Sequence, residues 1–400
     1  MDKKRKKSNN AVSVGSAIAV IVGVFLGVSI IAGGAFYVAT RPHITDESAV
    51  IAAAAIDTAS MPMEEPAPVL QVSPSPEPEP TPTPELTPEP APAPSPYITI
   101  TVSAAGDTTL GGDSRWHGYH RFMYEFQRNG MDHSFFLRNV RDIFYESDLA
   151  ILNLEGTLTY ATEHMDKEFV FRGPPHFAQI LSAGAIDVVT IANNHTIDFF
   201  DRGYQDTRNA LAAEGIIYFG NEFNTIVEVN GINVGLFGFR IWNMSQENKN
   251  RITAAVADLR ERGAQLIIAY HHWGTENVNM ANDVQRTMGR YTVAAGADLV
   301  LGAHPHVIQG IEVYQNVNIV YSLANFSFGG NSNPPDQDSF IFQQTFTFRD
   351  GILQDTNDTY IIPVRVSSTR AYNNFQPTVA TYDDAERIMR RLQTYSEWLQ

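Results

Sequence analysis

Five short segments of this sequence place metal-binding side chains directly after apolar runs. They are Gly106-Asp107, Asn153-Leu154-Glu155, Asn193-Asn194-His195, His271-His272-Trp273-Gly274 and His304-Pro305-His306. Each is expected to follow the C-terminal end of a strand. Because ligands of open α/β sheets bind beyond the carboxyl ends of the strands, these side chains should meet in one crevice. Carboxylate, amide and imidazole groups gathered in this way favour a site for divalent metal ions.

Asp107 and Glu155 are the candidate carboxylate ligands. Asp107 follows Gly106, which lets the backbone turn tightly, although a Gly-Asp pair is also common in ordinary turns. Glu155 closes a largely apolar strand, where a carboxylate is costly unless it is paired or binds a metal.

Asn194 and His195 offer two different functions. The Asn194 amide oxygen can bind a metal, and His195 is then free to act as a proton donor. Asp198, three residues further on, could fix the His195 tautomer by accepting a hydrogen bond. The alternative is an Asn-rich loop that carries a surface histidine.

The remaining histidines come in two pairs. Side chains alternate along a strand, so only one of His271 and His272 can face the crevice. His304 and His306 are two residues apart, and an extended backbone would place both imidazoles on one side. A packed pair of histidines is the alternative.

Arg172 and Asn325 are candidates for contact with a substrate. Arg172 could clamp a phosphate or carboxylate, although a single arginine in a loop is usually surface charge. Asn325 ends another apolar segment and could support the site through a hydrogen bond.

The elements that must position these residues alternate between strand and helix patterns. Strands are predicted at 97–103, 149–152, 188–192, 234–239, 265–270, 298–301 and 319–323. Helices are predicted at 135–144, 203–214, 252–262, 283–295 and 383–399. Several strands are continuous Val/Ile/Leu runs, as in sheets covered on both faces. This alternation predicts an α/β layered domain.

The first residues of the chain predict a membrane anchor. Residues 1–14 form a basic tail with Lys-Lys-Arg-Lys-Lys at 3–7, and residues 15–40 are apolar and uncharged. About 20 apolar residues cross a bilayer as one helix, and a basic flank stays in the cytoplasm. We therefore expect a single-pass signal anchor in the cell membrane, with a cytoplasmic N-terminus and an extracytoplasmic domain. A cleaved signal peptide is the alternative.

Residues 41–96 predict a disordered, Pro-rich stalk. Fourteen of the 22 prolines lie between 62 and 96, and such a run prefers extended polyproline II geometry. Beyond the stalk we expect one domain at 97–345 and a C-terminal extension at 346–400 that ends in a helix.

The charge distribution bears on the partners of the chain. The net charge is −16, and the first 41 residues carry +5, so the remainder carries −21. A strongly acidic ectodomain argues against non-specific binding to nucleic acid. The sequence has no cysteine, so the stability of the domain must come from its core rather than from disulfides.

Taken together, the motifs resemble the CapA family, the capsule-synthesis proteins associated with poly-γ-glutamate. The resemblance covers roughly residues 98–345 and rests on Ala104–Asp113, Asn153–Thr157, Ala192–Asp198, His272–Glu276, Gly302–Val307 and Tyr321–Phe326. It implies a fold similar to the calcineurin-like metallophosphoesterases, a sandwich of two sheets flanked by helices. A membrane anchor with an outside domain also suits this family.

The resemblance implies a role for each motif residue. Asp107 matches the first metal-binding aspartate and Glu155 the bridging acid. Asn194 matches the amide ligand, and His195 matches the histidine that protonates a leaving group. The remaining metal ligands are His272, His304 and His306.

One departure from the metallophosphoesterase pattern affects the metal site. These enzymes usually have a histidine two residues after the first aspartate, where Thr109 stands here, and Glu155 replaces the usual aspartate. We expect one or two ions of Mn, Fe or Zn, bound with unequal affinity. The position formed by Glu155, Asn194, His272 and His304 should be the firmer one.

The resemblance leaves three functions open. The first is metal-dependent hydrolysis of a phosphate ester, an anhydride or a polymer amide during poly-γ-glutamate synthesis or export. The second is a non-catalytic scaffold that binds poly-γ-glutamate and membrane synthase subunits. The third is a general cell-surface metallophosphoesterase unrelated to capsule.

Overall fold

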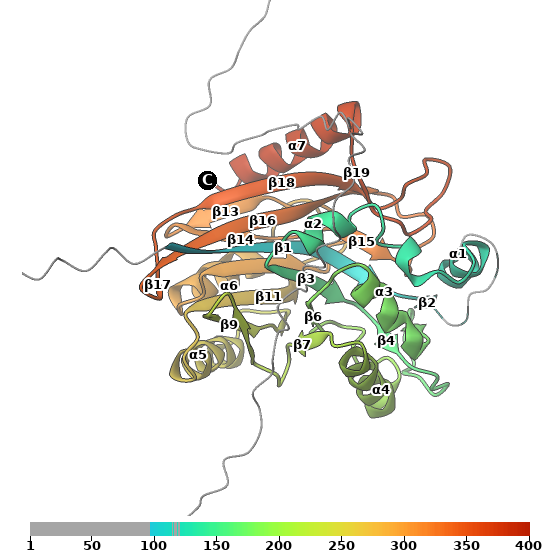
Figure 1. Cartoon of the computed structure of the whole chain (residues 1–400), viewed down its shortest axis with the longest axis horizontal. Coiled ribbons are helices and arrows are strands. Elements are labelled where there is room, and N and C mark those ends of the chain that lie inside the picture. Colours follow the sequence, from blue (N-terminus) through green and yellow to red (C-terminus); the bar gives the residue numbers. More distant parts are fainter. Residues whose placement is uncertain (1–96, 114, 116–117, 119–120) are drawn as a thin grey trace, which may run out of the picture.

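Two large β-sheets lie face to face in this chain, with helices on both outer sides (Figure 1). The computed structural model describes residues 97–113, 115, 118 and 121–400. The predicted basic tail, membrane span and stalk therefore lie outside the described residues. Within the described part of the chain, the helices are too short or too polar to cross a membrane.

The first sheet has the strand order β19-β18-β16-β1-β3-β6-β7. In addition, β15 pairs with β1 and β17 pairs with β16. Neighbours β1, β3, β6 and β7 are parallel, whereas β16 and β18 are antiparallel additions. The strands are β1 (Tyr97–Thr109), β3 (Leu149–Leu154), β6 (Val188–Thr190), β7 (Ile217–Phe219), β15 (Asn325–Phe328), β16 (Asp338–Arg349), β17 (Ile352–Leu353), β18 (Asp358–Arg365) and β19 (Thr378–Val379).

The second sheet has the order β13-β14-β12-β11-β9-β8, with β10 paired to β11. Strands β9, β11, β12 and β14 are parallel. The members are β8 (Thr225–Val229), β9 (Ile232–Phe237), β10 (Arg240–Ile241), β11 (Leu266–Trp273), β12 (Leu299–Ala303), β13 (Ile311–Tyr314) and β14 (Val317–Val320). A small third sheet joins β2 (Gly112–Asp113), β5 (Phe171–Gly173) and β4 (Thr157–Leu158).

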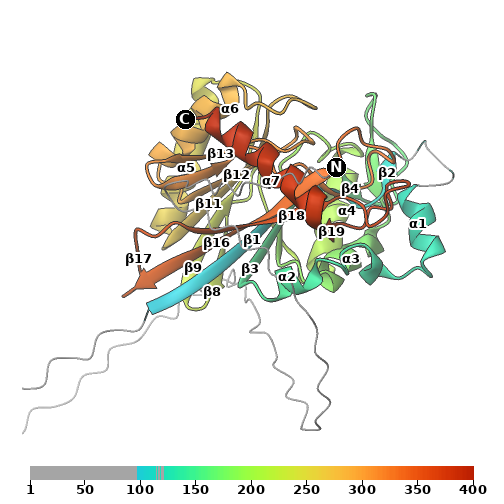
Figure 2. The ribbon, with the colours of Figure 1, turned by 90° about the horizontal axis from the view of Figure 1, so that it is seen from above.

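Helices cover the outer face of each sheet, as the view from above shows (Figure 2). Beside the first sheet lie α1 (Phe122–Arg128), α2 (Arg141–Tyr145), α3 (Ala178–Ala183) and α4 (Phe200–Ala213), with 3₁₀ turns at His133–Phe135 and Pro175–Phe177. Beside the second lie α5 (Gln246–Glu261) and α6 (Asp283–Ala294). Helix α7 (Tyr382–Glu397) packs on β18, β13 and β16. The predicted α/β sandwich flanked by helices is thus confirmed at the level of its layers.

Side-chain alternation explains how this sandwich holds together. In β11, Leu266, Ile268 and Tyr270 join the core between the sheets, whereas Ile267 and Ala269 face α5 and α6. The strands of the first sheet alternate in the same manner between the central core and the helices on their outer face. Both faces are apolar, which accounts for the continuous apolar runs in the sequence.

Most predicted strands and helices are present with shifted ends. The helix predicted at 135–144 is instead a 3₁₀ turn followed by the short α2. Asp132 explains this start, because its carboxylate accepts a hydrogen bond from the Ser134 amide at 2.8 Å and caps the tight turn. Residue 345, the predicted domain boundary, falls inside β16, and β18 continues the same sheet.

Candidate metal centre

The carboxyl ends of the parallel strands of both sheets meet at one place. The first sheet brings Asp107 at the end of β1, Glu155 just after β3, and Asn194 and His195 after β6. The second brings His272 near the end of β11, and His304 directly after β12. The His304 amide lies 3.1 Å from Asp107 Oδ2, which joins the two sheets at this point. The predicted ligands therefore come together, although they span most of the domain sequence.

Gly106 allows this approach. A Cβ atom at this position would lie 1.9 Å from the Ala324 carbonyl oxygen, a distance that real Cβ atoms do not reach. The neighbouring Asp107 amide instead donates a hydrogen bond to the same carbonyl at 2.8 Å. The glycine predicted as a turn residue thus serves close backbone packing, which presents Asp107 to the centre.

Glu155 is the middle of the cluster. Its side chain is fully buried, and neither carboxylate oxygen has a hydrogen-bond partner among the described residues. Oε1 lies 3.8 Å from Nε2 of His195 and 3.8 Å from Nε2 of His272. A buried carboxylate without a partner lowers the stability of the fold by roughly several kcal/mol, unless a cation or a hydrogen-bond donor compensates its charge. The residues here therefore fit a bound cation.

Three groups of side chains could each hold one ion. Each group offers ligand atoms that lie within 4.8 Å of one another. The groups are Asp107, Glu155 and His306; Glu155, His272 and His304; and Glu276, His304 and His306. Imidazole and carboxylate ligands of this kind suit Mn, Fe or Zn without deciding among them.

Asparagine side chains orient the ligands around Glu155. Asn194 Oδ1 lies 2.7 Å from Nε2 of His272, so both reach the same place. Asn153 Nδ2 donates to Asp107 Oδ1 at 2.7 Å and lies 3.4 Å from Nδ1 of His272. Such partners fix ligand orientation and commonly matter for metal affinity.

His195 is held by a network of its own. Its Nδ1 lies 2.7 Å from Asp198 Oδ2, as the spacing in the sequence predicts. Lys167 Nζ donates to Asp198 Oδ1 at 2.7 Å, and the Phe171 ring stacks on the imidazole with centroids 4.1 Å apart. This arrangement leaves Nε2 as the nitrogen that faces Glu155.

His304 and His306 lie in the cluster, but their backbone does not have the extended conformation that was predicted. Their φ angles are 94° and 59°, in the left-handed region that non-glycine residues rarely adopt. Asn325 holds His306, because its Oδ1 lies 3.0 Å from Nδ1 and its Nδ2 donates to the His306 carbonyl oxygen at 3.2 Å. Strained backbone of this kind often occurs at functional sites.

The two histidines differ in protonation. Burial, and then the charge of His306, lowers the pKa of His304 to about 4. Burial alone would also lower the pKa of His306. The negative charges of Glu155 and Asp107 outweigh this effect and raise the pKa of His306 to about 10. Burial, followed by the Asp107 charge, raises the pKa of Glu155 well above its usual range. Without a cation, the raised pKa of His306 therefore keeps this histidine protonated at neutral pH.

Two of the predicted candidates lie elsewhere. His271 faces the other side of β11, where its Nε2 lies 3.1 Å from Thr292 Oγ1 of α6. Arg172 lies in β5, donates a hydrogen bond to the Ala161 carbonyl oxygen and stacks over the Phe199 ring at 5.2 Å. Its proposed contact with a substrate phosphate stays a prediction.

Other residues of the centre were not predicted. Trp242 follows β10, is 46% exposed, and lies over His304 with ring centroids 4.8 Å apart. Lys167 and Glu276 come from loops whose sequence carries no periodic signal. Only Glu276 had a usable signal, because it stands in the same His-Trp-Gly-Thr-Glu segment as His272.

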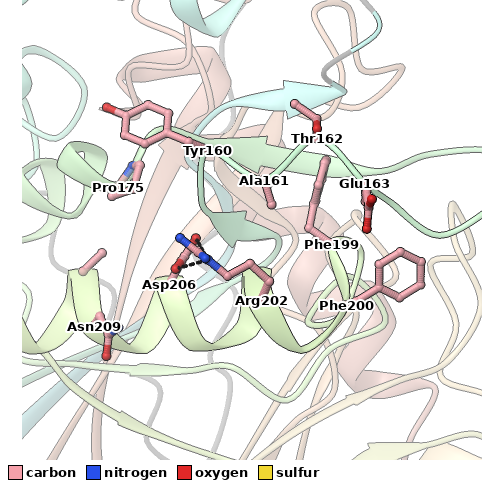
Figure 3. A pocket seen from close by; sticks show the side chains of 11 residues that line it. Tyr160, Ala161, Thr162, Glu163, Pro175, Phe199, Phe200, Arg202, Asp206 and Asn209 are labelled. Carbon is pink, nitrogen blue, oxygen red and sulfur yellow. Dashed lines mark hydrogen bonds and ion pairs between the residues drawn. The ribbon is translucent and has the colours of Figure 1, made fainter.

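A cavity of about 740 Å³ lies beside α4, apart from the predicted metal ligands (Figure 3). Phe199, which follows Asp198 directly, forms one wall, and Tyr160 forms another. Arg202 and Asp206 pair across its floor, with Arg202 Nε donating to Asp206 Oδ1 at 2.8 Å. The other lining residues are Ala161, Thr162, Glu163, Pro175, Phe200, Asn209 and Ala210.

Comparison with known proteins identifies the family of this chain. Residues 101–330 match the family described as "Bacterial capsule synthesis protein PGA_cap". The chain belongs to this family. The resemblance predicted from the motifs is thereby confirmed.

Individual relatives are 25% to 29% identical to the chain over the residues that align. Over 223 residues it is 29% identical to the "PGA biosynthesis protein CapA" of Bacillus subtilis (strain 168), which covers 50% of this chain and 58% of that protein. Over 227 residues it is 27% identical to the "Capsule biosynthesis protein CapA" of Bacillus anthracis, covering 50% and 55%. A "Probable polyglutamine synthesis accessory protein" of Mycobacterium tuberculosis (strain ATCC 25618 / H37Rv) is 25% identical over 281 residues, covering 61% and 73%. The match thus spans little more than half the length of the two Bacillus relatives.

Proposed function

We propose that this family member is a metal-dependent hydrolase that acts outside the cell during poly-γ-glutamate capsule synthesis or export. Its reaction would be hydrolysis of a phosphate ester or anhydride, or of an amide in the polymer. The single observation that carries this proposal is the buried carboxylate of Glu155, which has no hydrogen-bond partner among the described residues and is faced by histidines from both sheets. The names of the Bacillus relatives support the link to capsule synthesis.

The proposed ligands are those that face Glu155 and Asp107. Glu155, Asn194, His272 and His304 would hold one ion, and Asp107, Glu155 and His306 a second. A bound divalent ion supplies Lewis-acid polarisation of the scissile bond and activates water as a nucleophile.

His195 is the residue proposed to move a proton. Asp198 accepts a hydrogen bond from Nδ1, so when the ring carries a second proton, on Nε2, that proton points toward the centre and can pass to a leaving oxygen or nitrogen. Lys167 and the Phe171 amide both donate to Asp198, so this carboxylate is fixed in place. The Phe171 ring covers one face of His195 and limits the access of water there.

The proposal also includes a cellular location for the domain. The apolar stretch at 15–40 and the Pro-rich run at 41–96 would anchor the domain in the cell membrane and hold it outside. Separation of membrane and soluble fractions, with protease treatment of intact cells, tests both parts of this proposal.

The catalytic proposal is tested with the purified full-length chain and a panel of phosphate esters, anhydrides and glutamyl amides. With Mn, Fe or Zn added, His195→Ala should lower the turnover by about 10²- to 10⁴-fold, the usual contribution of a general acid. Its metal content should match that of the wild type, because His195 is not one of the proposed ligands. His133→Ala is the control, since His133 packs on His176 and Phe126. Unchanged turnover in His195→Ala would contradict the assignment.

A scaffold function is the second candidate, favoured by the word "accessory" in the name of the mycobacterial relative. In that case the domain would bind the polymer and synthase subunits without hydrolysis. Capsule production in cells that carry His195→Ala separates the two functions. Production at the wild-type level supports the scaffold, and loss of production supports the hydrolase.

A further inference from the structure

Glu276 lies at the open edge of the metal centre. It belongs to the loop that joins β11 to α6, and its side chain is exposed. Even so, its carboxylate lies within 4.8 Å of ligand nitrogens of both His304 and His306. An exposed ion pair with these histidines would add little stability, so other contacts of the surrounding loop must hold Glu276 in this position.

Three hydrogen bonds fix this loop against the histidine segment. The Asn277 amide donates to the Pro305 carbonyl oxygen at 2.8 Å, between the two histidines. On the same side, Gln309 Nε2 donates to the Val278 carbonyl oxygen at 2.7 Å, and Asn279 Nδ2 donates to that of Ile308 at 3.1 Å. Glu276 is therefore held beside His304 and His306 by its backbone.

His304 supplies an independent indication of a cation site. Its side chain is 8% exposed, and its Nδ1 has no hydrogen-bond partner among the described residues. A buried ring nitrogen without a partner is costly, and a metal ion is one of the few groups that can satisfy it. Glu276 is the exposed carboxylate that is grouped with His304 at this site.

We propose that Glu276 is a further metal ligand, which binds from the solvent-facing rim together with His304 and His306. This inference rests on the proposed metal-binding function of the centre. Three protein ligands leave coordination positions open toward solvent, as in catalytic rather than structural metal sites. The rim position would then be the one that an incoming anionic substrate meets first.

The test measures metal affinity rather than turnover. Mn²⁺ and Zn²⁺ are titrated into the purified, metal-stripped full-length chain by calorimetry, and Mn²⁺ binding is followed by electron paramagnetic resonance. Glu276→Gln should weaken the affinity of at least one ion by about tenfold or more, since changes near metal ligands commonly cost 10- to 100-fold. Glu276→Asp, which keeps a shorter carboxylate, should restore part of the affinity.

Glu386→Gln is the matched control. It makes the same chemical change at an exposed position of α7, whose contacts are with β13, β16 and β18. Wild-type affinity and stoichiometry in Glu276→Gln would overturn the inference while leaving the metal centre intact. If the wild-type chain binds neither ion, the proposed function fails together with it, so the two failures are distinguishable. Circular dichroism of each variant confirms that the fold is retained.

Discussion

His306 and His304 show how two identical side chains can carry different charges a few ångströms apart. Their ring centroids are 5.9 Å apart. Glu155 and Asp107 raise the pKa of His306 to about 10, whereas burial and His306 lower that of His304 to about 4. At neutral pH and without metal, His306 therefore holds a proton and His304 does not.

This difference predicts that metal binding at pH 7 releases a proton from His306. Affinity should consequently rise with pH from neutrality toward about 10, because the competing proton is lost over that range. Calorimetry in two buffers of different ionisation enthalpy counts the released protons. His306→Asn should remove the His306 proton from this count, and His304→Asn should weaken binding without changing the count. A heat of binding that does not depend on the buffer would contradict the prediction.

At the residue scale, motif spacing was sufficient to predict that the candidate ligands following the core strands lie close together. Asp107, Glu155, Asn194, His272 and His304 lie where strand ends dictate their position. Glu276, Lys167 and Trp242 come from loops instead. Hydrogen bonds to distant segments place Lys167 and the loop of Glu276, and ring contacts place Trp242. Nor did the residue type of His306 reveal its left-handed backbone, which depends on packing around Pro305.

At the scale of elements, strand β11 carries a buried histidine on each face. His272 faces the metal centre, and His271 faces α6. Burial lowers the pKa of His271 from 6.5 to about 3. The unfolded chain therefore binds a proton between these pH values that the folded chain does not. This contribution to stability is complete above pH 6.5 and is lost as the pH falls toward 3.

We predict that His271→Asn flattens the dependence of stability on pH. In the metal-free protein, the free energy of unfolding of the variant should change by about 1.4 kcal/mol less per pH unit than that of the wild type between pH 6 and pH 4. Urea unfolding at both pH values measures this difference. The slope is informative even if the variant loses stability at every pH through the missing Thr292 contact. Equal slopes would show that His271 does not titrate as its burial requires.

Helices and strands with a strong hydrophobic periodicity could be predicted from the sequence. Elements whose ends depend on turns or caps were harder to predict. The β8–β9 hairpin was not predicted, although Asn230-Gly231 is a typical hairpin turn and adopts φ angles of 52° and 79°. The start of α5 was predicted too late, at 252, because the Ser245 cap was missed; its hydroxyl accepts a hydrogen bond from the Asn248 amide at 3.2 Å. By contrast, the pairing of β16 with both β1 and β18 depends on long-range contacts that no local pattern contains.

At the scale of the whole molecule, α7 covers one side of the sandwich. Ile388 and Leu392 enter the core between the two sheets, and Arg387 donates to Asp338 Oδ1 of β16 at 2.6 Å. The C-terminal segment is thus continuous with the core that begins at β1. The sequence predicted this helix but not the shared core, because its strand partners lie on both sides of residue 345.

Ile388→Ala should therefore destabilise the whole domain. Ile388 is fully buried, and removing such a side chain typically costs about 2–5 kcal/mol through lost burial and the remaining cavity. The exposed Glu386→Ala, on the same helix, should change the free energy of unfolding by less than about 0.5 kcal/mol. Urea denaturation of both variants, followed by circular dichroism, gives the comparison. A loss confined to helical signal, with the sheets intact, would show that α7 is a separate unit.

The hydrogen bond between His304 and Asp107 joins residues that are 197 positions apart. Asp107 and Glu155 come from the first sheet and His272 and His304 from the second, so the two proposed sites that contain Glu155 can form only after β12 has docked against β1. For the proposed hydrolase, docking of the two sheets would therefore come before binding at these shared sites. The ion taken up would then depend on the metals dissolved around the chain at that stage as well as on the order of metal affinities.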